Sequence, residues 1–151
     1  MISRYLDGII PTPPQPSELT EVEHALMEKQ RAALAGMAEA IDDYLLHEAL
    51  RSCWGFVRAA NAYVEAVTPW ALAKDDSRRR RLEVVLYQLA DSLRLLAVMV
   101  APIVPRAAEE LWRRLGEQGS VHDRTHEDLR WGLSAEGRQT ISGPPLFPRL
   151  N

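Results

Sequence analysis

The chain has 151 residues, of which 46% are hydrophobic and 26% charged, and its formal net charge is −3. These values fit one globular domain and exclude a disordered, collagen-like or coiled-coil chain. The longest uncharged apolar stretch, residues 95–105, is about half the length of a membrane-spanning helix, so we expect no membrane partner. A lone Cys53 and an N-terminus without the basic and apolar regions of a secretory signal predict a cytoplasmic protein.

The charges are distributed unevenly along the chain. Residues 1–73 carry 5 basic and 10 acidic side chains, a balance of −5, whereas residues 74–151 carry 13 and 11, a balance of +2. Lys74 and the run Arg78-Arg79-Arg80-Arg81 form the main basic cluster. Such a cluster can contact phosphates, although a solvated helix start is the commoner use of surface arginines.

The first sixteen residues contain two distinct segments. Ile2, Leu6 and Ile9 have helical spacing, but no capping residue precedes them, so we interpret residues 1–10 as the remnant of a first helix that starts in mid-course. Residues 11–16 hold four prolines, which exclude a helix or an inner strand. We expect them to form an extended linker.

Apolar residues then recur at intervals of three and four, which predicts amphipathic helices. The predicted helices cover residues 17–41, 45–67, 78–100 and 103–115. The capping and terminating residues are Ser17 or Thr20, Pro69, Asp75, Asp76, Ser77, Pro102, Pro105 and Gly116. The connections are too short for parallel strands, so the pattern favours an antiparallel helical bundle.

Residues 117–151 differ from this pattern, because they contain four glycines and three prolines and show no comparable period. We expect a tail that wraps around the bundle and includes short strands. The expected fold is therefore all-α: one domain over residues 1–151, with helices across residues 17–116 and an irregular C-terminal tail.

Signatures of an enzyme are weak. The sequence has no glycine-rich phosphate loop, no cysteine pair for a metal and no nucleophile elbow. His122 and His126 have a spacing that suits a metal on a helix, but their segment has no helical period and no third soft ligand, so we expect no metal site. The adjacent acids at 42–43, 75–76 and 109–110 would point apart on a helix, which favours a solvated surface or a cap over acid–base catalysis.

Two residues near the end of the second long helix are unusual. Trp70 directly follows Pro69 between two predicted helices, where a turn would hold the indole at the end of the bundle. Such an indole either packs back on the core or offers a flat stacking surface to a ligand. Asn61 falls near the apolar stripe of its helix, and we expect its amide to hydrogen-bond the backbone of a neighbouring helix.

Several stretches of this sequence match a known family. Ala60-Asn61-Ala62-Tyr63 and Thr68-Pro69-Trp70-Ala71-Leu72-Ala73-Lys74 resemble the anticodon-binding domain of the methionyl-tRNA synthetases. Further stretches agree in the same order: Arg4-Tyr5-Leu6-Asp7-Gly8, Leu93-Arg94-Leu95-Leu96-Ala97, Pro102, Pro105, Ala108-Glu109, Leu111-Trp112 and Pro145-Leu146-Phe147-Pro148-Arg149-Leu150. The resemblance spans nearly the whole chain.

The resemblance implies a helical bundle that grips the anticodon loop of methionine tRNA, with Trp70 stacking on an anticodon base. The expected RNA-binding residues are Trp70, Lys74, Arg78, Arg79 and Arg81, and the expected supporting residues are Asn61, Tyr63 and Pro69. The expected partners are the tRNA and the catalytic domain of the same enzyme.

Other parts of the family pattern are not in this sequence. The His-Ile-Gly-His-like and Lys-Met-Ser-Lys-Ser-like motifs are absent, so we expect no catalysis from this chain alone. ATP and Mg²⁺ would belong to the missing catalytic domain, and no cofactor is expected here. The family also places an anticodon-reading Asn and Arg upstream of the element that matches Asp7-Gly8, which would precede Met1 and indicates a fragment.

A second hypothesis belongs to another class of protein. In this alternative the chain is a helical protein-interaction domain, and Trp70 and residues 11–16 dock a partner protein or the missing domain. A salt titration separates the two, because phosphate contacts weaken linearly in log salt and an apolar interface barely responds.

Overall fold

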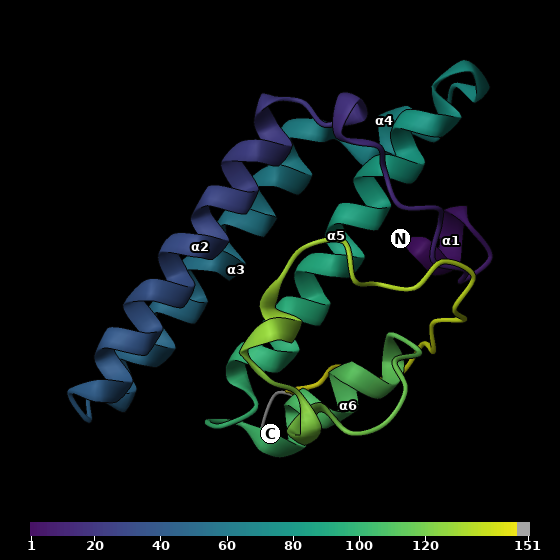
Figure 1. Cartoon of the computed structure of the whole chain (residues 1–151). Helices are drawn as coiled ribbons and strands as arrows, with labels where there is room; N and C mark the ends of the chain where they lie inside the picture. Colours follow the sequence, from purple (N-terminus) through teal and green to yellow (C-terminus); the bar gives the residue numbers. More distant parts are fainter. Residues whose placement is uncertain (148–151) are drawn as a thin grey trace.

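The computed structural model describes residues 1–147, so the expected match over Pro148, Arg149 and Leu150 lies outside the described residues. The helices are α1 (Ile2–Tyr5), α2 (Glu21–Asp42), α3 (Leu46–Val67), α4 (Pro69–Leu72), α5 (Arg79–Val100) and α6 (Pro105–Arg114) (Figure 1). Short 3-10 helices cover Pro16–Glu18, Asp76–Arg78, Val121–Asp123 and His126–Leu129. The all-helical fold is as predicted.

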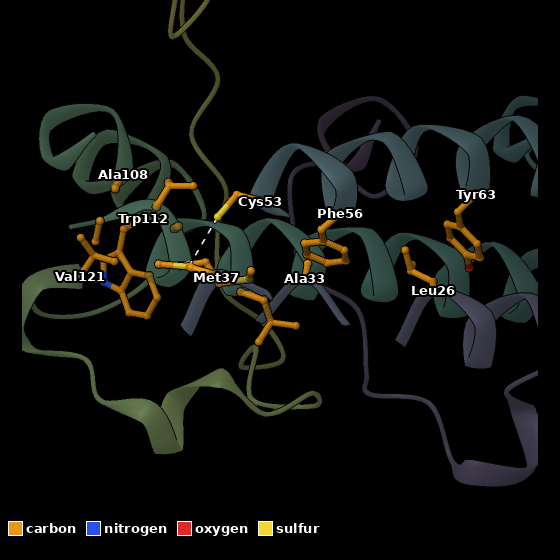
Figure 2. Close-up of a cluster of buried hydrophobic side chains, with 14 of the residues drawn as sticks. Leu26, Ala33, Met37, Cys53, Phe56, Tyr63, Ala108, Trp112 and Val121 are labelled. Atoms are coloured by element: carbon orange, nitrogen blue, oxygen red, sulfur yellow. Dashed lines mark hydrogen bonds between the residues drawn. The ribbon is translucent and has the colours of Figure 1, made fainter. Parts of the chain in front are cut away.

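Helices α2 and α3 form a long antiparallel hairpin that extends away from the rest of the chain (Figure 1). Thr20 caps α2 through a capping box with Glu23, and the turn between the helices places Tyr44 at a positive φ of 60°. Along the shared seam, Met37 faces Cys53, with their sulfur atoms 3.6 Å apart (Figure 2). Burial raises the pKa of the Cys53 thiol to about 11, which makes it a packing residue instead of a nucleophile.

Helix α5 is the centre of the structure, since 14 of its 22 residues are buried. Its apolar side chains, including Leu82, Leu86 and Leu95, lie in the same core as residues of α3 and α6. Helix α6 closes one end of this core with Ala108 and Trp112, both buried (Figure 2). The buried surface of α5 is therefore wider than one apolar stripe, since Leu95 is buried and Leu93, seven residues after Leu86, is exposed.

The tail, residues 117–147, is held on α5 by a buried ion pair. Asp91 and Arg94 are joined at 2.6 Å, and neither side chain is more than 2% exposed. Arg94 Nη1 donates to the carbonyl of Asp128, and Asp91 accepts hydrogen bonds from the backbone and hydroxyl of Ser134. Polar contacts with α5 thus order a segment that has no periodic pattern of its own.

Three features differ from the sequence-based expectations. The short strands predicted in the tail are wrong: within residues 1–147 the tail has two 3-10 helices and one isolated bridge between Ile9 and Gln139. Helix α4 was not predicted, because four residues are too few to show a period. Helix α1 ends early, since Asp7 and Gly8 adopt φ of 51° and 82° and reverse the chain toward that bridge.

Candidate functional site

The Trp70 turn, residues 68–78, connects α3 to α5 at one end of the bundle. Thr68 ends α3 with a left-handed backbone, φ 44° and ψ 66°, and the buried Pro69 occupies the first position of α4, where no N–H is needed. This geometry leaves the Trp70 side chain 46% exposed. Trp70 is therefore partly exposed at this end of the bundle, and its role as a stacking surface stays a prediction.

Two cations accompany Trp70 in the same turn. Lys74 and Arg78 are exposed, and they follow α4 directly. Between them the carboxylate of Asp75 accepts hydrogen bonds from the backbone and hydroxyl of Ser77, at 3.0 and 2.6 Å, and these bonds lower the pKa of Asp75. The turn thus presents one flat aromatic surface and two side chains able to contact phosphate.

The next two arginines of the basic run bind the N-terminal segment of the chain. Arg79 Nη1 donates to the carbonyl of Tyr5 at 3.0 Å, although its side chain stays 53% exposed. Arg80 makes two 2.7 Å hydrogen bonds to the carboxylate of Glu18, and it also reaches the carbonyls of Thr12 and Pro13. The hydrogen bond from Arg80 lowers the pKa of Glu18 to about 2. Arg80 therefore fastens the proline-rich linker to α5.

Arg81 takes part in a buried polar cluster with Glu23 and Tyr63. Glu23 is fully buried, and its Oε1 accepts hydrogen bonds from Tyr63 Oη at 2.5 Å and Arg81 Nη2 at 2.7 Å. Its Oε2 accepts from the hydroxyl and backbone of Thr20 at 2.6 and 2.8 Å. Burial alone would raise the pKa of Glu23, but hydrogen bonds from Arg81, Thr20 and Tyr63 outweigh it and lower the pKa to about 2. Burial, together with the bond to Glu23, raises the pKa of Tyr63.

The other sequence-predicted residues lie apart from this end. Asn61 is exposed on α3, at the rim of a groove formed with Leu93 and Leu96 of α5, and the hydrogen bond expected of its amide stays a prediction. His122 and His126 belong to separate 3-10 helices, and His122 Nε2 lies 3.8 Å from Glu109. Within residues 1–147 no group of three or more metal-ligating side chains comes together.

Sequence reasoning missed an exposed apolar tip on the α2–α3 hairpin. Tyr44 is 91% exposed and Leu46 is 62% exposed, with Ile41, Leu45 and Trp54 also exposed nearby. The signal was available, because three large apolar residues, Tyr44, Leu45 and Leu46, directly follow Asp42-Asp43. The role of Glu23 was also missed, although Thr20 and Glu23 have the spacing of a capping box.

The helical bundle has the same fold as part of a protein whose structure has been solved. The apo form of Mycobacterium tuberculosis methionyl-tRNA synthetase matches with a TM-score of 0.86 and 24% identity, over 100% of this chain and 30% of that chain. The same enzyme in complex with methionyl-adenylate matches with a TM-score of 0.85. This likeness shows a helical-bundle fold that also occurs in a tRNA synthetase.

The chain belongs to the family described as the anticodon-binding domain of tRNA ligase, whose family model matches residues 23–135. A methionine–tRNA ligase of Caldanaerobacter subterraneus is 35% identical over 151 residues, which cover 100% of this chain and 23% of that protein. The corresponding ligase of Bacillus subtilis is 31% identical and is covered to 22%. The chain spans less than a quarter of the length of these curated relatives. No helix within residues 1–147 is long and apolar enough to cross a membrane.

Proposed function

We propose that this chain recognises the anticodon loop of methionine tRNA on behalf of a methionine–tRNA ligase. One observation carries the proposal: Trp70 is half exposed at the end of the bundle, in the turn between α3 and α5. An unpaired anticodon base stacks on this indole. Base–aromatic stacking contributes roughly 1–3 kcal/mol of binding free energy per base. In a small interface this single contact supplies a large share of the binding free energy.

The phosphates of the loop are contacted by the cations beside Trp70. Lys74 and Arg78 are exposed in the same turn and make the main contacts. Arg79 adds a weaker contact from its exposed side, because its guanidinium is also bound to the carbonyl of Tyr5. Arg81 contributes chiefly through Glu23, since its side chain is only 26% exposed. Tyr63 and Pro69 support the turn from the bundle, and Asn61 lies on the exposed side of α3.

The chemistry of aminoacylation belongs to another part of the ligase. The catalytic domain binds ATP and Mg²⁺ and attaches methionine to the tRNA, whereas this chain supplies binding without a cofactor of its own. Its place of action is the cytoplasm. The proposal is supported by the family match over residues 23–135 and by whole-length similarity to methionine–tRNA ligases.

A second candidate function is a protein-interaction domain, which the exposed hairpin tip favours. Tyr44 and Leu46 form an apolar surface that a partner protein could cover. The tip and the Trp70 turn lie at opposite ends of α3, so the two functions involve different surfaces.

A titration of an anticodon stem-loop RNA at several salt concentrations tests the proposed function. With two or three phosphate contacts, the observed binding constant should fall with a log–log slope of about −1.4 to −2 for single-stranded RNA. A methionine anticodon should bind more tightly than a stem-loop of equal length with a changed anticodon. Binding that ignores both salt and anticodon would exclude RNA recognition and favour the protein-interaction domain.

A further inference from the structure

One buried carboxylate holds both ends of the segment that carries Trp70. Tyr63 lies in the last full turns of α3, before that segment, and Arg81 lies in the first turn of α5, after it. Both side chains donate to the same oxygen, Glu23 Oε1, at 2.5 and 2.7 Å. Residues 64–80 therefore form a loop whose two ends meet on a third helix, α2.

The Trp70 turn has little packing of its own. Only Pro69 and Leu72 are buried between residues 68 and 78, whereas Trp70 and Lys74 are exposed. Its backbone also contains the left-handed Thr68, a conformation that a β-branched residue adopts only when the surrounding structure imposes it. An external constraint is thus needed to fix the position of the indole.

Glu23 is itself fixed in place. Its other oxygen, Oε2, accepts hydrogen bonds from the backbone and hydroxyl of Thr20 in the capping box of α2. No part of the Glu23 side chain reaches solvent. Because the carboxylate is bound on both oxygens, it cannot follow a movement of Tyr63 or Arg81. The cluster is consequently a rigid reference point between α2, α3 and α5.

We propose that Glu23 is a positioning residue for Trp70: through Tyr63 and Arg81 it sets the geometry in which the indole is offered to the anticodon base. This inference rests on the proposed function for its RNA-binding consequence. Its structural part, that the cluster restrains the Trp70 turn, stands on the contacts alone.

A matched pair of variants tests the inference. Tyr63→Phe removes the hydroxyl that donates to Glu23, and Tyr87→Phe removes an equally buried hydroxyl that donates to the carbonyl of Ser134 in the tail. Both variants delete one buried hydrogen bond and keep the ring, and thermal stability should fall more in Tyr63→Phe, because its bond is to a carboxylate and that of Tyr87 is to a neutral carbonyl. Only Tyr63→Phe should loosen the Trp70 turn.

Two readouts are measured on both variants. Amide hydrogen exchange across residues 68–78 should accelerate roughly two- to tenfold in Tyr63→Phe and stay unchanged in Tyr87→Phe, the range that the loss of one hydrogen bond allows. Affinity for the methionine stem-loop should fall by a similar factor in Tyr63→Phe only. Glu23→Gln should produce a larger effect in the same direction, and if it fails to fold, Tyr63→Phe still decides.

A double-mutant cycle separates positioning from general stability. In the Trp70→Ala background, Tyr63→Phe should weaken RNA binding by a smaller factor, because the indole is gone and only Lys74 and Arg78 remain to be positioned in the turn. An unchanged exchange rate in the Trp70 turn, or equal acceleration by Tyr87→Phe, overturns the inference whatever the RNA result. If exchange accelerates but Trp70→Ala leaves RNA binding intact, the restraint is real and the proposed function, together with its RNA consequence, is wrong.

Discussion

Replacing Trp70 with alanine should separate its contribution to binding from its contribution to stability. Truncating a fully buried Trp costs about 3–5 kcal/mol, so a side chain that is 46% exposed should cost about half of that. For a chain of this size 1 kcal/mol changes the melting temperature by roughly 2–4 °C, which predicts a fall of about 3–10 °C. Loss of one stacked base should weaken binding of the stem-loop about tenfold or more.

Trp54 is a matched control for this experiment. It is 44% exposed, almost the same as Trp70, but it lies on α3 about 20 Å from the C-terminal end of that helix. Trp54→Ala should therefore lower the melting temperature by a similar amount and leave RNA affinity unchanged. Calorimetry and fluorescence anisotropy at low salt measure the two quantities. A large thermal destabilisation by Trp70→Ala with intact binding, or equal losses of affinity in both variants, would refute the stacking role.

Three further predictions concern charge and catalysis. Lys74→Ala and Arg78→Ala should each weaken stem-loop binding and make the salt slope shallower by roughly 0.7, without changing discrimination between anticodons; altered discrimination would contradict a phosphate role. Because the folded pKa of Glu23 is about 2, below its ordinary value of 4.5, its stabilisation is complete above pH 4.5 and lost as the pH falls toward 2. The free energy of unfolding of the wild type should therefore fall by about 3 kcal/mol on acidification, and this fall should be missing from Glu23→Gln. If the free energies of unfolding of the two proteins change with pH in parallel, Glu23 does not contribute this stability. Finally, the purified chain with ATP and methionine should give no pyrophosphate exchange above a control without protein, and exchange would show that the chain is catalytic.

The helices could be predicted from the sequence because each one carries apolar residues at helical spacing. Leu82, Leu86 and Val100 belong to the predicted stripe of α5 and are buried, although Leu93 of the same stripe is exposed, and Pro69 and Pro102 mark where α3 and α5 must stop. The position of Trp70 at the end of the bundle followed from the same reasoning. These are local properties of the chain, which one sequence is enough to show.

The use of the arginine run could not be predicted in the same way. Four consecutive arginines indicate positive charge, but their partners Glu18 and Glu23 lie about 60 residues away in the sequence. Tertiary packing brings Glu18 to Arg80 and Glu23 to Arg81, and these ion pairs occupy two of the four guanidinium groups. The course of the tail could not be predicted either, because it depends on hydrogen bonds to Asp91 and Arg94 and not on a sequence pattern of its own.

The backbone pairing between the two outer parts of the chain has a consequence for the order of folding during synthesis. Ile10 donates to the carbonyl of Arg138 and accepts from Gly137, and Thr140 donates to Gly8, so segments some 130 residues apart are joined. The α2–α3 hairpin is local and can form while later residues are still in the ribosome. The paired segments cannot meet until translation has passed residue 140, so the backbone groups of Gly8 and Ile10 that these bonds satisfy stay open to solvent, or to a chaperone, until then, although the Ile10 side chain can already pack on Tyr87 and Ala90 of α5.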